Sequence, residues 1–494
     1  MLPEFQGARI ALLEPQPPVR LNELQKLITT TPTNIDLRTF AISPSSQRLF
    51  QAIGAWELMS SVSISPYQSM QVWDSLGPGY FRFNTPSNST SLGWILENRV
   101  LQSSLFERIL QIQNENKNLT LYSSISVNKL ILPPIPLQPA LPSSIRPTNT
   151  TIPEGSLAKL ILNNGKEIHS RLVIGADGAM SKVRSTANIG TWGWDYDQKA
   201  VVATVKLGDH DNTAWQRFLP NGPVAILPLR DNYASIIWST TPSHADYLMS
   251  ISNEDFINAL NTVLTAEPRL FMEALRGENT PSSASSTSSS TTTTNPDIHI
   301  SSTSTNDAYN QQKDTLWLDP VATLLKTGEK IMQQLSTASF QTDPFRRPPL
   351  VLSSIGSRGT FPLKFFNAQS YISPRLALVG DAAHVIHPLA GQGMNLGLGD
   401  VDTLATILAT NIYNGNDIGS INILKEYEQS RMTQNLLMMT AVDSIKRLFT
   451  SVPDGQFGAH LREPLTFARN IGMLTLNNAL PIKVQLATYA MGGT

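Results

Sequence analysis

The chain has 494 residues, which is too long for one ordinary hydrophobic core and predicts two or three domains. Its 37 basic and 38 acidic side chains give a formal net charge of −1, so no positive field favours nucleic acid as a partner, and the absence of cysteine excludes disulfides and thiolate metal sites. No stretch has the roughly 18 to 20 apolar residues of a membrane span, and the N-terminus lacks the regions of a secretory signal.

The N-terminal segment Gly7–Gln16, GARIALLEPQ, predicts a buried β-strand that ends on an acid, Glu14. In dinucleotide-binding folds such an acid binds ribose hydroxyls, and it normally lies about 20 residues after a glycine-rich turn that receives the pyrophosphate. Only thirteen residues precede Glu14, so the acid comes unusually early.

The first half of the chain then alternates helices and strands, as an α/β domain does. In chain order the pattern predicts a helix over 49–59, a strand pair over 72–84, a helix over 94–112, a strand over 119–132, a Pro-rich surface segment over 132–147 and a hairpin-like pair over 157–178. The Asn-Gly dipeptide inside the last pair is typical of a hairpin turn.

The second half begins with strands of period two at 199–207 and 224–241, which predict an antiparallel sheet. Residues 280–307 are rich in Ser and Thr and too polar to offset their ordering entropy, so a disordered insertion is predicted at about 276–312. An α/β pattern returns at 375–413, with a strand, a loop containing several glycines and a long helix.

Residues 375–402 carry the strongest functional signal. The strand delivers Asp381 at its carboxyl end, where ligands bind in open α/β sheets. Pro388 then stiffens the approach, and Gly391 and Gly393 allow backbone amides to reach a ligand at the start of the next helix. Free amides and the helix dipole favour an anionic or electron-rich group, such as a reduced flavin ring. A helix capped by an aspartate is the structural alternative.

Four further residues of this segment are assigned structural roles. His384 and His387 lie in the loop without a matching acid or cysteine cluster, so packing is favoured over metal ligation. Gly397 and Gly399 are predicted to be helix-packing glycines.

A second signal is VIGADGAMSKVR, residues 173–184. Asp177 and Gly178 occupy a tight turn after a buried strand, and Ser181 and Arg184 follow on the next helical turn. A strand followed by a Gly-Asp turn is common, and Arg184 alone can be an exposed helix residue.

The third signal is NIDLRTFAIS, residues 34–43. Arg38 lies one segment after Glu14, where a guanidinium would reach the phosphate or ribityl oxygens of a nucleotide cofactor. Arg99 and Gln102 face the same site if their helix packs beside the first helix of the cofactor domain, and an exposed helix face is an equal alternative.

Together these stretches resemble the flavoprotein aromatic hydroxylases of the para-hydroxybenzoate hydroxylase fold, and most closely the mitochondrial branch that hydroxylates the ring of ubiquinone (coenzyme Q) precursors. The resemblance extends from Arg9 to about Phe449, apart from the insertion. It is carried by DLRTFAIS, WILENRVLQSSL, VIGADGAMSKVR, GWDYDQKAVVATV, FLPNGPVAILPL, LALVGDAAHVIHPLAGQGMNLGLGDV and YEQSRMTQNLLMMTAVDSIKRLF. GWDYDQKAVVAT and the last of these stretches narrow it to the ubiquinone branch.

The resemblance implies an α/β fold with a Rossmann-like FAD-binding domain, an antiparallel β-sheet substrate domain and a C-terminal helical segment. The implied boundaries are 1–62, 93–190 and 370–430 for the discontinuous FAD-binding domain, 63–92 and 191–369 for the substrate domain, and 431–494 for the helical region. The residues that would contact FAD, carried over from the family, are Glu14, Arg38, Asp177, Gly178, Gly380, Asp381, Pro388, Gly391, Gly393, Met394 and Asn395.

The activity implied by the resemblance is hydroxylation of ring position C5 of a polyprenylated phenol with O₂ through a flavin C4a-hydroperoxide, while the protein orients the substrate and excludes water. No catalytic acid or base is assigned. The electron source is either ferredoxin with its reductase or NAD(P)H. The implied location is peripheral, on the matrix face of the mitochondrial inner membrane, in association with other ubiquinone-synthesis proteins. The tail at 464–491 predicts a packing helix, with a membrane-surface or partner helix as the alternative.

Compared with the family pattern, the chain is expected to lack the first strand, its G-x-G-x-x-G turn and a transit peptide. GQGMNLG at 391–397 is no substitute, because its third glycine is one residue late. The missing strand is central in the family order, so two sheet edges are predicted to have no ladder partner. A truncated sequence is favoured over an alternative start or a fold completed by another chain. Two other functions stay open: a non-catalytic scaffold subunit of the ubiquinone-synthesis assembly, and a hydroxylase of another phenol.

Overall fold

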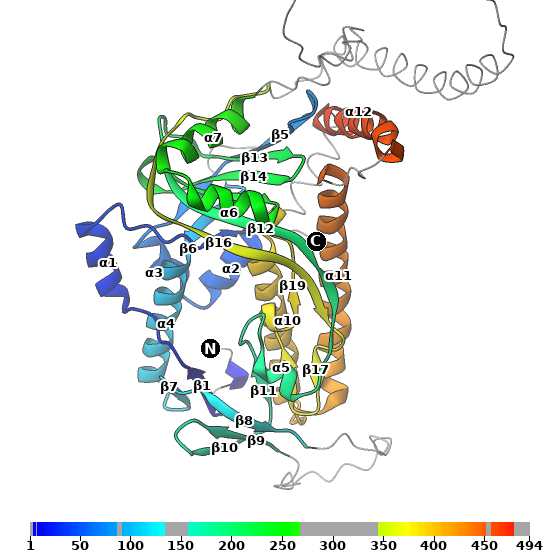
Figure 1. Cartoon of the computed structure of the whole chain (residues 1–494). Helices are drawn as coiled ribbons and strands as arrows, with labels where there is room; N and C mark the ends of the chain where they lie inside the picture. The colour runs from blue at the N-terminus through cyan, green and yellow to red at the C-terminus, as the bar shows by residue number, and fades with distance from the viewer. Residues whose placement is uncertain are drawn as a thin grey trace, which may run out of the picture.

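The computed structural model of the chain describes residues 3–5, 7–85, 91–133, 157–266, 344–450 and 456–478. The insertion expected at about 276–312 and nearly all of the Pro-rich segment expected at 132–147 lie outside the described residues. A large curved sheet lies at one end of the molecule, and smaller sheets lie at the other end beside the N-terminus (Figure 1).

The large sheet confirms the predicted antiparallel region and adds one parallel pair. Its eight strands, in spatial order, are β19 (His384–Val385), β16 (Val351–Ala368), β12 (Thr191–Leu207), β15 (Tyr233–Thr240), β14 (Gly222–Pro228), β13 (Thr213–Leu219), β4 (Ser69–Asp74) and β5 (Tyr80–Asn84). The predicted pair at 72–84 is the antiparallel pair β4 and β5. The sequence pattern did not indicate β13, which pairs in parallel with β4. That pairing joins segments far apart in the chain, so no local periodicity reveals it.

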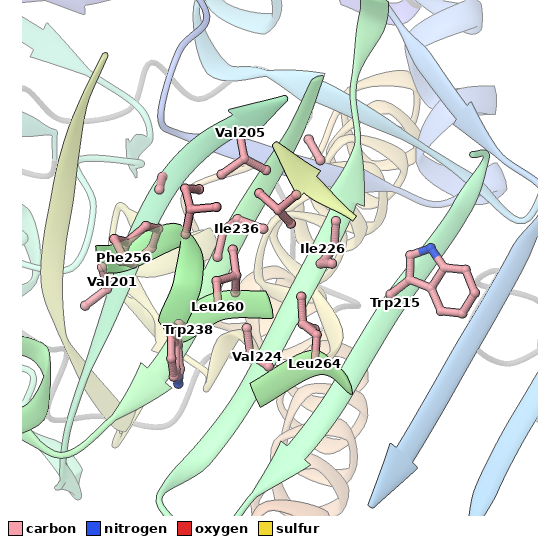
Figure 2. Packing of buried hydrophobic residues seen from close by; sticks show 14 of the residues in the cluster. Val201, Val205, Trp215, Val224, Ile226, Ile236, Trp238, Phe256, Leu260 and Leu264 are labelled. Carbon is pink, nitrogen blue, oxygen red and sulfur yellow. The ribbon is translucent and has the colours of Figure 1, made fainter. Parts of the chain in front are cut away.

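One face of this sheet is covered by two helices, α6 (Pro242–Ser250) and α7 (Asn253–Thr265). Val201 and Val205 lie on the same face of β12 because strand side chains alternate with period two. Both belong to a buried cluster with Phe256 of α7 (Figure 2). Burial of this cluster fixes the register of the central strands, since a one-residue slip would turn its members toward the opposite face.

The opposite face packs on the C-terminal half of the chain. Tyr196 and Ala200 of β12 share a buried cluster with Leu389 of the glycine-containing loop and with Met439 of α11 (Ile421–Thr450). The sheet therefore fixes the position of that loop against α11.

The parallel strands form two separate pieces. β1 (Ile10–Glu14) pairs with β7 (Leu119–Ser123), and β11 (Val173–Gly175) pairs with β18 (Leu376–Leu378), which also pairs with β17 (Ile372–Ser373). Among the described residues no strand is hydrogen-bonded between β1 and β11, as the expectation of two unpartnered edges required. Packing still joins the pieces, because Leu13 of β1 contacts the buried cluster that includes β18.

The boundary between strand and helix predicted at 94–112 is wrong. Trp94 lies in β6 (Gly93–Glu97), between β2 (Thr39–Ile42) and β3 (Ser65–Tyr67), and helix α4 begins only at Asn98 (Asn98–Glu115). Pairing on both edges outweighs the helical periodicity of the apolar residues here.

Two other predicted elements are divided by residues with positive φ. Gly54, at φ 72°, separates the helix predicted at 49–59 into α2 (Pro44–Ala52) and α3 (Trp56–Ser60). Ser124, at φ 59°, turns the chain inside the strand predicted at 119–132, which forms β7 and β8 (Val127–Ile131). A left-handed residue ends regular structure because neither helix nor strand continues through it.

The remaining elements complete the two ends of the molecule. They are η1 (Pro3–Phe5), α1 (Leu21–Thr30), β9 (Ala158–Leu162), β10 (Glu167–Ser170), α5 (Lys182–Thr186), η3 (Arg230–Asn232), η4 (Gly380–Ala382), η5 (Pro388–Ala390), α10 (Gly393–Tyr413) and α12 (Gln456–Asn478). The predicted hairpin is the antiparallel pair β9 and β10. α11 continues across the expected domain boundary at 430/431. Among the described residues, no helix is both long enough and apolar enough to span a membrane.

The described part of the predicted tail packs on the large sheet as α12. Arg469 donates hydrogen bonds to Asp74 of β4 from Nε at 2.7 Å and from Nη2 at 3.2 Å, and both side chains are buried. Asn470 also donates to the Asp74 carboxylate at 3.0 Å. The helix is therefore tied to the sheet by a buried ion pair.

We expect Asp74→Asn to lower the free energy of unfolding by about 3 to 5 kcal/mol, because the variant leaves the buried charge of Arg469 uncompensated. Asp195→Asn is the control, since Asp195 is exposed and pairs with Lys364 at 3.6 Å, an interaction worth about 1 kcal/mol or less. Denaturant unfolding measures both. Equal losses in the two variants would contradict the role of α12.

Candidate functional site

The candidate site is built around the turn η4, which follows β18. Gly380 has φ 59°, and a Cβ added at Gly397 of α10 would lie 3.1 Å from the Gly380 Cα. A Cβ added at Gly399 would lie 2.8 Å from Nη2 of Arg431. The helix-packing roles predicted for Gly397 and Gly399 are therefore confirmed, because both glycines allow neighbouring elements to approach α10.

Asp381 and Arg38 are brought together at this turn. Neither side chain makes a hydrogen bond to a described residue, although the Arg38 backbone N–H is held by Asp36 Oδ1 at 3.1 Å. Desolvation raises the pKa of Asp381, and the positive charges of His384 and Arg38 partly oppose this rise. An available carboxylate beside an available guanidinium can bind hydroxyl and phosphate groups of one ligand.

Asp400 lies at the centre of a buried network that holds the turn in place. Its Oδ2 accepts hydrogen bonds from the Gly380 backbone N–H at 3.0 Å and from His384 Nε2 at 2.7 Å. Its Oδ1 accepts from Arg431 Nε at 2.8 Å and from Asn435 Nδ2 at 3.0 Å. Burial raises the pKa of Asp400, but the hydrogen bonds and charges of its partners outweigh burial and hold the pKa below its usual value. One carboxylate thus connects η4, α10 and α11, and the structural role predicted for His384 is confirmed.

Asn395 joins the first turn of α10 to the β2–α2 junction. Its Oδ1 accepts hydrogen bonds from the Ser43 backbone N–H at 3.0 Å and from Ser46 Oγ at 2.8 Å, and its Nδ2 donates to the Ala41 carbonyl at 3.0 Å. The neighbouring Met394 packs against the apolar cluster under α2. Both residues therefore serve the fold, and their contacts with a cofactor stay predictions.

The turn at Asp177 caps a helix. Asp177 accepts hydrogen bonds from the Lys182 and Val183 backbone N–H groups at 2.8 and 3.1 Å, and Gly178 has φ 81°. Arg184, which sequence reasoning left as a plausible surface residue, donates from Nη1 to the Ala382 carbonyl at 2.7 Å. This bond links the two predicted ligand-binding turns, and the only sequence signal for it was the position of Arg184 one helical turn after the Gly-Asp turn.

Three candidate residues make other contacts. Arg99 donates to Asn34, to the side-chain oxygen at 3.0 Å and to the carbonyl at 2.7 Å, so it supports the loop before β2. Gln102 is exposed and accepts a hydrogen bond from Asn98. Glu14, at the end of β1, accepts one from the Gln16 backbone N–H at 2.9 Å. The alternative of structural or exposed roles describes the contacts of Arg99 and Gln102.

Comparison with known proteins decides the family. A model of the FAD binding domain family matches residues 328–440, which include η4 and α10. The mitochondrial ubiquinone biosynthesis monooxygenase COQ6 of Danio rerio is 32% identical over 99% of this chain and 85% of that protein. The Homo sapiens protein of the same name is 30% identical over 98% of this chain and 87% of that protein. The chain belongs to the COQ6 family of ubiquinone biosynthesis monooxygenases.

Solved structures place the fold of this COQ6 relative. The p-nitrophenol 4-monooxygenase PnpA of Pseudomonas putida has a TM-score of 0.57 at 13% identity, covering 99% of this chain and 93% of that chain. PqsL of Pseudomonas aeruginosa, a probable FAD-dependent monooxygenase, has a TM-score of 0.57 at 14% identity, covering 95% and 94%. These identities show the fold alone. With the sequence relatives and the domain match, they identify an FAD-dependent aromatic monooxygenase whose cofactor is FAD.

The residues around η4 fit such a cofactor. Asp381 and Arg38 keep their polar groups available for its hydroxyl and phosphate oxygens. Gly391, at φ 61°, turns the chain into the N-terminus of a 21-residue helix whose free amides favour negative charge. The donors and acceptors present therefore suit a flavin nucleotide.

We expect Asp400→Asn to lower the free energy of unfolding by about 3 to 5 kcal/mol at pH 7, because Arg431 then becomes a buried charge without its counter-ion. The folded state depresses the Asp400 pKa, so this stabilisation is present above the ordinary aspartate pKa and is lost as pH falls below about 4. Unfolding at several pH values tests this against Asp402→Asn, an exposed acid on the same helix. Two variants equally stable at pH 7 would refute it.

Two glycine variants separate folding from cofactor binding. Gly391→Ala forces a Cβ into a φ of 61° and to 3.1 Å from the Ala41 Cβ, so we expect a loss of about 1 to 2 kcal/mol in stability. A Cβ at Gly393 meets only Ile386, at an ordinary 3.6 Å, so Gly393→Ala should leave the apoprotein unchanged. A flavin against this amide would be pushed away, and we expect FAD to bind about tenfold more weakly. FAD titration and thermal melts measure both, and wild-type FAD affinity in Gly393→Ala would argue against the assigned flavin position.

Proposed function

We propose that this chain hydroxylates ring position C5 of a polyprenylated phenol in ubiquinone biosynthesis. The observation that carries the proposal is the convergence of Asp381, Arg38 and the N-terminus of α10 at one turn, in a chain similar to COQ6 along almost its whole length. The chemistry of these groups suits the flavin end of an extended FAD.

In this proposal the residues act by binding and orientation. Asp381 accepts hydrogen bonds from ribityl hydroxyls, and Arg38 binds phosphate or ribityl oxygens. The amides at Gly391 and Gly393 donate toward the electron-rich edge of the flavin, and Asn395 and Asp400 hold those amides in place. When bound, FAD supplies the reduced ring that activates O₂. The apolar cluster beside Leu389 keeps water from the ring of the substrate.

The adenosine end of the cofactor falls to Glu14, Asp177 and Gly178 in this proposal. Glu14 ends β1 and Asp177 follows β11, the two strands whose facing edges carry no ladder partner among the described residues. Ile10 and Ile174 are 36% and 48% exposed on these strands, which is unusual for a parallel sheet. This observation favours a second candidate function, a COQ6-like scaffold subunit that binds FAD weakly or not at all.

We also propose the cellular setting. The names of the relatives include the mitochondrion, and a peripheral position on the matrix face of the inner membrane would give access to a polyprenylated substrate. Electrons would come from ferredoxin and its reductase or from NAD(P)H, and other ubiquinone-synthesis proteins would be partners.

The test is to purify the chain, record its flavin absorbance and analyse products with each electron donor. We expect a yellow protein that converts a prenylated phenol to its C5-hydroxylated product and converts the unprenylated phenol at least tenfold less efficiently. A colourless, folded protein that binds other ubiquinone-synthesis proteins would support the scaffold function instead. Equal turnover of both phenols would contradict the proposed substrate class.

A further inference from the structure

Three buried polar atoms meet beside the glycine-containing loop without a hydrogen-bond partner among the described residues. They are Nε2 of His387, the hydroxyl of Tyr196 and Oδ1 of Asp443, which we call the polar cluster. His387 is 1% exposed, Tyr196 8% and Asp443 9%. Buried polar atoms without partners are rare in folded proteins, because each costs about 1 to 3 kcal/mol. The cluster therefore indicates a polar ligand group.

The structure defines the proton position on His387. Its Nδ1 accepts a hydrogen bond from the Leu389 backbone N–H at 3.1 Å, so this nitrogen carries no proton. Burial, followed by the charge of Lys446, lowers the pKa of His387 to about 4, although Asp443 opposes this effect. At neutral pH the single ring proton is on Nε2, which is a fixed donor within the cluster.

Tyr196 is the second donor. Its ring lies 5.0 Å from the His387 ring, nearly perpendicular to it, and Lys446 Nζ lies 4.9 Å from the Tyr196 ring centroid. Burial and then the facing carboxylate of Asp443 raise the Tyr196 pKa, and the charge of Arg447 opposes them. The hydroxyl therefore keeps its proton.

Asp443 is the acceptor. Its Oδ2 accepts a hydrogen bond from Arg447 Nε at 2.7 Å, which leaves Oδ1 for the cluster. The charged groups facing the cluster are Asp443, Lys446 and Arg447, and all of them come from α11. Two cations beside one carboxylate favour an additional negative charge at this position.

We propose that the polar cluster is a subsite for the phenolic hydroxyl of the substrate, in which His387 and Tyr196 donate to the phenol oxygen and Asp443 accepts its proton. The inference rests on the proposed function. A hydroxyl group has one proton to donate and lone pairs to accept, which matches two donors and one acceptor. The O–H bond breaks, its proton moves to Asp443 Oδ1, and the electron pair stays on oxygen. The resulting phenolate ring is richer in electrons, as ring hydroxylation requires.

The place of the cluster supports this assignment. His387 immediately precedes Pro388, at the start of the loop assigned to the flavin, and Tyr196 belongs to GWDYDQKAVVAT, the stretch that distinguished the ubiquinone branch. Tyr196 and Leu389 belong to the same apolar cluster, which gives the ring an apolar surrounding next to its polar anchor. The hydroxyl of the substrate would thus be held on the face of the loop opposite α2.

The test uses the FAD-loaded protein with two probes, 2-geranylphenol and its methyl ether, titrated while flavin absorbance is recorded. We expect the wild type to bind the phenol at least tenfold more tightly than the ether. Tyr196→Phe and Asp443→Asn should each reduce this preference at least fivefold, because both remove a partner of the hydroxyl and keep the shape of the side chain. Asp443→Asn should also reduce kcat for the prenylated phenol more than it changes KM.

Matched controls are Tyr247→Phe and Asp402→Asn, which alter an exposed tyrosine and an exposed aspartate elsewhere. Both should retain the wild-type preference. If the variants of the cluster weaken both probes equally, or retain the preference, a buried water fills the cluster and the subsite is refuted while the proposed function stands. A wild type that binds neither FAD nor the probes overturns the proposed function, and the subsite with it.

Discussion

The candidate site depends on one buried carboxylate. Asp400 binds the backbone of Gly380 and the ring of His384 with one oxygen, and Arg431 and Asn435 with the other. Without this carboxylate the turn before Asp381 would lose its anchor on α10, and α11 would lose its main polar contact with the turn. The polar groups left over after this arrangement, Asp381 and Arg38 among them, are those that face a ligand.

The division between paired and unpaired groups explains how a stable fold presents a reactive surface. The network around Asp400 stabilises the ionised carboxylate, whereas the pKa of Asp381 is raised, so its ionised form costs stability in the ligand-free protein. Groups held in an unfavourable state without ligand are typical of binding sites, where ligand contacts restore what the fold gives up. The polar cluster at His387 shows the same property at a second position.

Local patterns in the sequence predicted the elements that carry the site. The strand before Asp381, the loop with Pro388 and the helix after Gly393 all appear as expected, because each depends on neighbouring residues alone. The roles of Asp400 and Arg184 were not predicted, since their partners lie 31 and 198 residues away. The strand at Trp94 was assigned to a helix for the same reason, because both of its ladder partners come from other parts of the chain.

The central claim is that the start of α10 receives the flavin. Amide hydrogen exchange, with and without FAD, tests this claim most directly because it reports on individual backbone N–H groups. The account predicts slower exchange on FAD binding at residues 391–395, with little change at residues 456–478 of α12 at the far end of the sheet. Unchanged exchange at 391–395 in a protein shown to bind FAD would contradict it.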